Sequence, residues 1–357
     1  MNPLGLFTLQ RVWYLALLVT FGAATAWQET IAAESAVVLR VGHFPHLTHA
    51  QALAGRALAR QGRPWFEKRL GSGVKLEWYV YNSGATAMEA LLSKSIDLAY
   101  AGPTPPINAY VRMKGREIRI IAGACSGGAA LVVQGDGPLK SVEDFRNRQI
   151  GTPQLGNTQD IAARTWLMHG GLQIRLTGGD ALVIPTANPD LYTLFKKKEL
   201  DAVWTIEPWV SRLVSEAGGR VFLEESELWK DLGGRYATTL VTGRESFLNE
   251  YPDLAAAFLK AHSELTVWLE ANPEEARTLV NDEFKEQTRR PLPEALLRES
   301  WKRIHLTTDP LQKSVERIVE DMRRTGFIRT EVDLGKLFHR VAPSSTTAVS
   351  TTPTPMP

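Results

Sequence analysis

The order strand, loop, helix, strand, loop, helix, strand occurs twice along the chain, and this repeat limits what the chain can fold into. Strands that alternate with helices predict parallel sheets with helices on both faces. The two copies also share a short pattern, because Ile96-Asp97 before Tyr100 aligns with Leu200-Asp201 before Trp204. The expected strand segments are 41–45, 76–81 and 95–103 in the first copy and 150–151, 181–184 and 199–208 in the second.

The loops that follow these strands consist mainly of small and polar residues. After the strand that ends at Gly151, Pro153 and Gly156 turn the chain, and Asn157 or Thr158 is a suitable N-cap for the next helix. The free N–H groups and the positive dipole end of such a helix favour an anion. Ligands of α/β sheets bind beyond the carboxyl ends of the strands. Two copies that face each other would therefore form one cleft lined by helix N-termini.

The length of 357 residues is sufficient for two lobes with cores of their own. We expect an α/β fold in which each lobe is a mostly parallel sheet flanked by helices. Crossings near 127–133 and 235–242 would make a hinge that lets the lobes close on a ligand. The expected lobes are 37–128 with 238–340, whose later part is nearly all helical, and 129–237.

Both ends of the chain carry segments that we expect to lie outside these lobes. Residues 1–33 read as an export signal, because Arg11 precedes an apolar run that is short for a membrane span. The alternative is an uncleaved anchor. A signal places the mature protein in the periplasm. Residues 341–357 have almost no charge or large apolar side chains, which predicts disorder.

The charge balance argues against nucleic acid as a partner. Lys and Arg number 41 and Asp and Glu 39, which gives a net charge of +2 and no general basic field. The single cysteine, Cys125, excludes an intrachain disulfide and reads as a small buried residue or as a reactive thiol.

Three histidines, His43, His46 and His49, are spaced three apart and raise the possibility of a metal site. Pro45 interrupts helical geometry between the first two, so hydrogen bonding by neutral imidazoles is the favoured interpretation. An enzyme that uses Cys125 with a histidine is a further alternative, but no third orienting group is visible. We expect no enzyme activity, no metal and no cofactor.

Several motifs in this order resemble the periplasmic solute-binding proteins of ABC importers, in particular the aliphatic sulfonate, taurine and nitrate group. The resemblance covers about residues 37–340. It implies a two-lobed periplasmic binding protein fold of type II, the venus flytrap. It also implies a monomer that delivers a small anion to a membrane permease and a separate ATPase. The motifs are Gly42-His-Phe-Pro, Thr48-His-Ala, Ser95-Ile-Asp-Leu-Ala-Tyr-Ala-Gly, Gly151-Thr-Pro, Gly156-Asn-Thr, Leu200-Asp-Ala-Val-Trp and Glu207-Pro-Trp.

The resemblance also implies a set of ligand-binding residues. Ser83, Asn157 and Thr158 would donate hydrogen bonds to sulfonate-like oxygens, and Trp209 would form an apolar wall. Glu207 would bind an amine of a taurine-like ligand or pair with an arginine across the cleft. The full set is His46, Thr48, His49, Ser83, Gly84, Thr104, Ser126, Gly156, Asn157, Thr158, Glu207, Trp209 and Tyr236.

The expected ligand is a taurine-like or alkanesulfonate-like anion. Nitrate, bicarbonate and a heterocyclic vitamin precursor are the alternatives within the same fold. A sensor subunit with the same binding lobes is a further possibility, because a fold does not determine a function.

Overall fold

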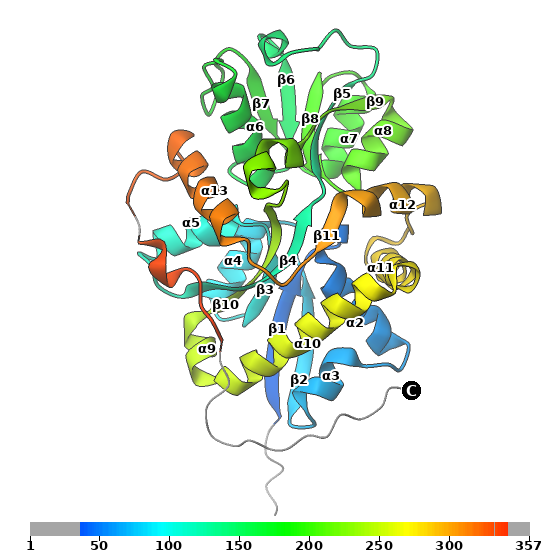
Figure 1. Ribbon diagram of the computed structural model, residues 1–357, viewed down its shortest axis with the longest axis vertical. Helices are drawn as coiled ribbons and strands as arrows, with labels where there is room; N and C mark the ends of the chain where they lie inside the picture. Colours follow the sequence, from blue (N-terminus) through cyan, green and yellow to red (C-terminus); the bar gives the residue numbers. More distant parts are fainter. Residues whose placement is uncertain (1–35, 332, 342–357) are drawn as a thin grey trace, which may run out of the picture. The chain divides into compact units, whose positions relative to one another are not determined.

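The computed structural model describes residues 36–331 and 333–341, and the described residues from Val38 onward form one compact unit. They contain two separate sheets, each with its own helices (Figure 1). The expected export signal and nearly all of the expected disordered tail lie outside the described residues. Among the residues described, no helix has the length and apolar character needed to cross a membrane.

The first lobe contains a six-stranded sheet in the order β11-β4-β10-β3-β1-β2. Helices cover both of its faces, because side chains of one strand alternate between them. Leu98 and Tyr100 face the cluster that includes α2 and α10, whereas Ala99 and Ala101 face the cluster of α4, α5 and α13. The strands are β1 (Val37–His43), β2 (Val74–Val80), β3 (Leu98–Ala101), β4 (Ile118–Gly127), β10 (Ala237–Arg244) and β11 (Ile304–Leu306).

The helices of this lobe follow either a strand, as α4 follows β2, or another helix, as α11 follows α10. They are η1 (Leu47–His49), α2 (Ala50–Arg60), α3 (Trp65–Leu70), α4 (Gly84–Leu92), α5 (Thr104–Arg112), α9 (Glu245–Glu250), α10 (Pro252–Ala271), α11 (Pro273–Thr288), α12 (Glu294–Arg303), α13 (Gln312–Arg324) and η4 (Leu334–Lys336).

The second lobe contains a five-stranded sheet in the order β7-β6-β8-β5-β9. Successive side chains of β5 again point to opposite faces of the sheet and pack into two cores. Leu131 and Val133 pack with α6, whereas Ala130 and Val132 pack with α7 and α8. The elements are β5 (Ala129–Gln134), η2 (Val142–Phe145), β6 (Gln149–Thr152), α6 (Thr158–His169), β7 (Leu182–Pro185), α7 (Asn188–Lys196), β8 (Ala202–Ile206), α8 (Trp209–Ala217), β9 (Gly219–Glu224) and η3 (Glu225–Leu232).

The two-lobed α/β architecture agrees with the sequence prediction, but the sheets are mixed rather than mostly parallel. β1 pairs in parallel with β3, and β6 pairs in parallel with β7 and β8. The strands that follow a crossing, β5 and β10, run antiparallel to their neighbours. Each starts at the side where the parallel strands end, so it must run away from that side.

The chain leaves the first sheet at Gly127 and enters the second at Ala129, and it returns between Glu224 and Ala237. The first passage falls within the predicted stretch 127–133, whereas the second begins before the predicted stretch 235–242 and ends inside it, at Ala237. Gly127 has a φ of 79°, and a Cβ there would lie 2.5 Å from the carbonyl oxygen of Arg303, so this position requires glycine. We propose that the lobes are bounded as the sequence predicts and that these passages form the hinge.

Several short elements are absent from the sequence prediction. Helix α5 begins Thr-Pro-Pro, which reads as a loop, yet proline is compatible with the first turn of a helix. Strand β11 is only three residues long and forms by pairing with the end of β4. Neither element has a local pattern long enough to identify it.

Arg303, the last residue of α12, connects the lobes by ion pairs. Its Nη1 donates to Glu207 Oε1 at 3.0 Å and its Nε donates to Glu224 Oε1 at 2.9 Å. The side chain of Glu207 is fully buried, whereas that of Arg303 is 24% exposed. Arg303 is therefore the counter-charge that balances a buried carboxylate of the other lobe.

Replacement of Arg303 by Met should destabilise the protein by roughly 3 kcal/mol, since it leaves the Glu207 carboxylate buried without a partner. Chemical denaturation measures the change. Adding Glu207→Gln should recover part of the loss. The control Arg298→Met removes an exposed pair with Glu294 on the same helix and should cost less than about 0.5 kcal/mol. Equal losses in both single variants would contradict this role of Arg303.

Candidate functional site

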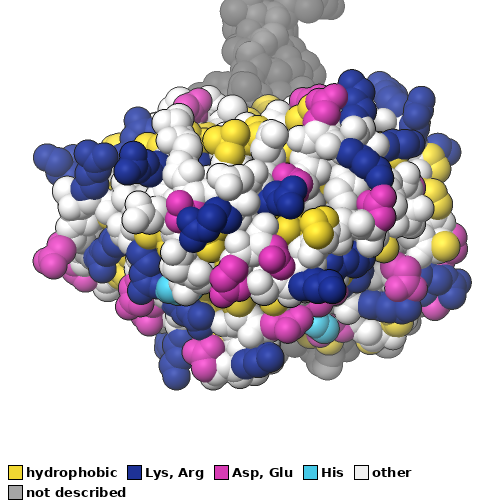
Figure 2. Space-filling model, turned by 90° about the horizontal axis from the view of Figure 1, so that it is seen from above, with side chains coloured by type: hydrophobic (Ala, Val, Ile, Leu, Met, Phe, Trp, Pro, Cys, Tyr) yellow, Lys and Arg dark blue, Asp and Glu magenta, His cyan; other side chains and the backbone are white. Residues whose placement is uncertain are grey.

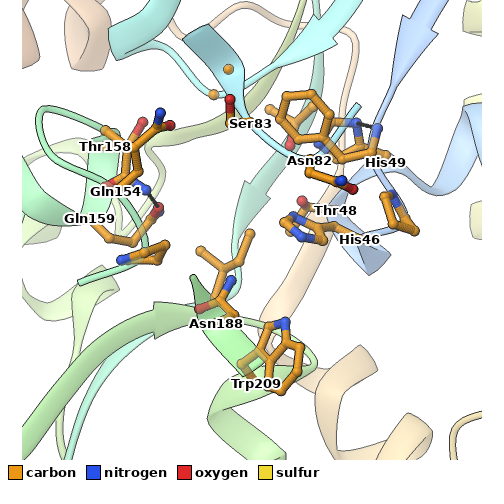
Figure 3. A pocket seen from close by; sticks show the side chains of 18 of the residues that line it. His46, Thr48, His49, Asn82, Ser83, Gln154, Thr158, Gln159, Asn188 and Trp209 are labelled. Carbon is orange, nitrogen blue, oxygen red and sulfur yellow. Dashed lines mark hydrogen bonds between the residues drawn. The ribbon is translucent and has the colours of Figure 1, made fainter. Parts of the chain in front are cut away.

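A cavity of about 640 Å³ is lined by residues of both lobes. Its walls are the loops that follow β1, β2, β3, β6, β7 and β8 and the first turns of the helices after them, together with parts of β10 and α11 (Figure 3). The lining residues are Phe44, Pro45, His46, Thr48, His49, Asn82, Ser83, Gly84, Gly102, Pro105, Pro153, Gln154, Asn157, Thr158, Gln159, Ala187, Asn188, Pro189, Ile206, Trp209, Thr238, Thr239, Phe284 and Thr288.

Two threonine hydroxyls of the first lobe lack hydrogen-bond partners among the described residues. They are the Oγ1 atoms of Thr48 and Thr239, side chains that line the cavity and are 0% and 1% exposed. A buried hydroxyl without a partner costs roughly 1–3 kcal/mol. A ligand that accepts hydrogen bonds in the cavity would remove this penalty.

His49 offers a further donor beside them. Its Nδ1 accepts a hydrogen bond from the backbone N–H of Phe44 at 3.3 Å, which leaves the proton of the neutral ring on Nε2. His46 lies next to it, with 5.9 Å between the ring centroids (Figure 3). The first lobe therefore presents hydroxyl and imidazole donors without a positively charged side chain.

Burial keeps the histidines of this region neutral. It lowers the pKa of His46 to about 4 and, with Arg56 nearby, that of His43 to about 3. Burial also lowers the pKa of His49 well below its usual value, and the neighbouring histidines add to the effect. Within residues 36–331 and 333–341, no group of His, Cys, Asp or Glu side chains is arranged to hold a metal ion.

The loop before α6 is shaped by an ion pair beneath it. Asp160 accepts hydrogen bonds from Thr152 Oγ1 at 2.8 Å and from the amide of Gly156 at 2.9 Å, and it pairs with Arg164 at 2.9 Å. Asn157 caps the helix, because its Oδ1 accepts from the amide of Asp160 at 2.8 Å. The first N–H groups of α6 are left for a ligand in the cavity.

Asn188 at the start of α7 and Trp209 at the start of α8 form the adjacent wall (Figure 3). The Oδ1 of Asn188 accepts a hydrogen bond from the hydroxyl of Thr205 at 2.6 Å. Its amide nitrogen points into the open space of Figure 3. The guanidinium of Arg212 lies 4.7 Å from the centroid of the Trp209 ring.

No Lys, Arg, Asp or Glu of the described chain is among the residues that line the cavity. The polar lining consists of neutral hydroxyl, amide and imidazole groups together with helix starts. The face drawn in Figure 2 shows Lys and Arg interspersed with Asp and Glu, without a field of one sign. An anion in the cavity would therefore be held by dipoles and hydrogen bonds rather than by an opposite charge.

Most of the residues that the resemblance implies line this cavity, and others do not. The lining residues among them are His46, Thr48, His49, Ser83, Gly84, Asn157, Thr158 and Trp209. Those outside the lining are Thr104, Ser126, Gly156, Glu207 and Tyr236.

The residues outside the lining have structural partners instead. The hydroxyl of Thr104 contacts that of Thr158 across the lobes at 3.4 Å. Ser126 Oγ accepts from the amide of Tyr236 at 3.1 Å, and the Tyr236 hydroxyl accepts from the amide of Ala129 at 3.2 Å, next to the crossings. Gly156 has a φ of 71°, and its Cβ position lies 2.8 Å from Phe327.

Glu207 faces Arg303 and Ser211 rather than the cavity. Ser211 donates to it from Oγ at 2.9 Å and from its amide at 3.2 Å, at the start of α8. Burial raises the pKa of this carboxyl group, while its partners act in the opposite direction. Of the two roles predicted for Glu207, the structure shows the pairing with an arginine across the lobes.

Cys125 lies fully buried inside β4 and does not line the cavity. Burial raises the pKa of its thiol to about 12. The thiolate that a nucleophilic cysteine needs is therefore absent at neutral pH.

Other lining residues, among them Asn82, Asn188 and Thr239, are missing from the sequence prediction. Asn82 lies two residues before α4 and Asn188 is the first residue of α7, so closeness to a helix start is a usable signal for both. Thr239 lies within a strand and carries no such signal, since its approach to the cavity depends on the pairing of β10 with β4.

Comparisons with known proteins agree with this architecture. A model of the NMT1-like family matches residues 32–281. The chain is 27% identical over 41% of its length to the nitrate/nitrite binding protein NrtA of Nostoc sp., covering 32% of that protein. It is 24% identical over 57% of its length to the taurine-binding periplasmic protein of Escherichia coli, covering 60% of that protein. The chain thus spans less than two thirds of these relatives.

Solved structures show the same fold. The alkanesulfonate-binding protein SsuA from Xanthomonas axonopodis pv. citri, bound to MOPS, superimposes with a TM-score of 0.68 at 18% identity. This match covers 85% of the present chain and 98% of that one. The aliphatic sulphonate binding protein SsuA from Escherichia coli gives a TM-score of 0.66 at 18% identity, covering 84% and 97%.

Replacement of Asp160 by Asn should destabilise the protein by roughly 3–5 kcal/mol, because it leaves Arg164, whose side chain is 2% exposed, without a counter-charge. The matched control is Glu216→Gln, which breaks another (i,i+4) pair with Arg212 on α8, where both side chains are about one-third exposed. The control should cost less than about 0.5 kcal/mol in urea unfolding. A small loss for Asp160→Asn would show that the loop before α6 does not depend on this pair.

The histidines with lowered pKa values predict that the free energy of unfolding falls as the pH is lowered from about 6.5 toward 4. The unfolded chain takes up protons in this range, whereas His46, with a pKa of about 4, stays neutral in the folded state. The slope is about 1.4 kcal/mol per pH unit for each such histidine. Urea unfolding at several pH values measures the slope, and His46→Gln should reduce it. An unchanged stability between pH 7 and pH 5 would contradict the neutral histidines.

Proposed function

Because the chain belongs to the NMT1-like family, we propose that it is the substrate-binding component of an ABC importer and captures a small organic anion between its lobes. The resemblance to solute-binding proteins that the sequence motifs indicate is confirmed by the family match and by the shared fold. In this proposal the liganded protein docks on a membrane permease, and a separate ATPase drives transport.

The observation that carries the proposal is the pair of unpartnered hydroxyls, Thr48 Oγ1 and Thr239 Oγ1. They lie in a cavity that is lined by helix starts of both lobes. An anion fits such a set, because it accepts hydrogen bonds from every direction and is stabilised by positive helix ends. Hydrogen bonds to charged groups contribute roughly 1.5–3 kcal/mol each.

An aliphatic sulfonate is the ligand class that we favour. A sulfonate head has three acceptor oxygens, which suits donors from the two lobes, and an organic tail suits the wall formed by Trp209. The taurine-binding and alkanesulfonate-binding relatives support the same class. Nitrate, bicarbonate and a heterocyclic vitamin precursor remain alternative ligands, and the nitrate/nitrite binding relative supports the first of these.

The same reasoning supports a binding protein over an enzyme. The relatives that match are named as binding proteins. The thiol of Cys125 is protonated and buried away from the cavity. We also propose that the protein is exported to the periplasm, where it would bind its ligand as a monomer.

Isothermal titration calorimetry with alkanesulfonates, taurine, nitrate, bicarbonate and a pyrimidine tests the proposed ligand class. Thr48→Val, which keeps the shape and removes the unpartnered hydroxyl, should weaken binding of the best anion about tenfold to a hundredfold. Its free energy of unfolding should stay the same or rise, because a buried polar group without a partner is lost.

The matched control is Thr165→Val. Thr165 Oγ1 is also buried and unpartnered among the described residues, but Thr165 does not line the cavity. This variant should show a similar change in stability and unchanged affinity. Heat only from the pyrimidine, or an unaltered affinity in Thr48→Val, would overturn the proposed anion site.

A further inference from the structure

We infer that the ligand carries no ammonium group and that its tail, opposite the anionic head, is apolar or aromatic. This inference rests on the proposed function, since it specifies which organic anions the same cavity accepts. It separates simple alkyl and aryl sulfonates from amino sulfonates such as taurine, although a relative is named for taurine.

The described lining of the cavity has no charged group that matches an ammonium. No carboxylate of the described chain lines it, and the carboxylate that the sequence suggested, Glu207, is fully buried against Arg303 and Ser211. An ammonium in the cavity would lose its water without gaining a counter-charge, which is strongly unfavourable.

The helix starts add a penalty of the same sign. Ser83 precedes α4, Asn157 precedes α6 and Asn188 begins α7, and all of them line the cavity. The positive dipole ends of these helices stabilise an anionic head and repel a cation placed beside it. A zwitterion therefore gains at one end and loses at the other.

An aromatic face can replace a carboxylate as the partner of an ammonium, and Trp209 is the obvious candidate. The guanidinium of Arg212 already lies 4.7 Å from the Trp209 centroid and 5.0 Å from that of Tyr192. The ring thus has a cation as a neighbour, and a second cation on it would be repelled by the first. An uncharged tail meets no such repulsion.

The walls and the size of the cavity suit an apolar tail. Large apolar side chains come from both lobes, and Trp209, Ile206, Phe44 and Phe284 are the bulkiest of them. The volume of about 640 Å³ lies in the range of roughly 300–1,000 Å³ that is typical of sites for drug-sized molecules. Nitrate or taurine would leave much of this space to water.

Taurine and 1-propanesulfonate form a matched pair of ligands, because they differ only in an ammonium against a methyl group. At pH 7 in calorimetry with the full chain, 1-propanesulfonate should bind at least tenfold more tightly than taurine. Longer alkyl chains should bind about fourfold more tightly for each added methylene until the cavity is filled. Benzenesulfonate should exceed methanesulfonate for the same reason.

Asn188→Asp supplies the missing carboxylate at the cavity wall. This variant should shift the preference toward taurine by at least tenfold relative to the wild type. The carboxylate attracts the ammonium of taurine, whereas the apolar tail of 1-propanesulfonate would displace water from the new charge. The control Asn188→Ala removes the same amide without adding charge and should weaken both ligands by similar factors.

The outcomes separate the two claims. Sulfonate binding with taurine equal to or tighter than 1-propanesulfonate would overturn this inference and leave the proposed function standing. No heat from any sulfonate would overturn the proposed ligand class, and the inference would fall with it. The predicted order together with the shift in Asn188→Asp supports both.

Discussion

The central constraint in this protein is the set of hydrogen-bond donors that the fold buries around one cavity without partners. Thr48 and Thr239 keep unpartnered hydroxyls in a lining that contains no charged side chain of the described chain. The helix starts of both lobes add N–H groups whose intrahelical partners do not exist. A folded protein leaves such groups unpaired at a cost in free energy, and the anion that we propose would remove that cost. In this account, the conformation of the loops and the uncharged lining both favour the binding of an anion.

The charged groups near the cavity are turned away from it, and they shape its walls. Asp160 and Arg164 pair beneath the start of α6 and fix the loop at Gly156. Arg303 balances Glu207 and reaches Glu224, which ties α12 to the other lobe. Both arrangements hold their carboxylates in structural ion pairs, and no carboxylate of the described residues lines the cavity. The selectivity for uncharged tails that we propose rests on this placement of the ion pairs.

Much of this structure could be predicted from the sequence, because the fold repeats a strong local pattern. Apolar strands followed by small and polar loops predicted the two lobes and the helix start at Asn157. The antiparallel course of β5 and β10 was missed, since it depends on which lobe the chain has just left. Glu207 looked like a ligand residue because its partner Arg303 is 96 positions away in the sequence. Thr239 was missed for a similar reason, as the neighbours of a strand residue are set by sheet pairing. Local chemistry thus identified helix starts, whereas long-range pairing decided which polar side chains remain free.

The most direct test of an anion site built from neutral donors is the pH dependence of affinity for one alkanesulfonate, whose own charge is constant above pH 3. Calorimetry between pH 5.5 and 8.5 should give dissociation constants that agree within about twofold, because burial holds the pKa of His46 near 4 and that of His49 well below its usual value. An affinity that rises about tenfold for each unit of falling pH would show that a protonated histidine supplies the charge, and would contradict the account.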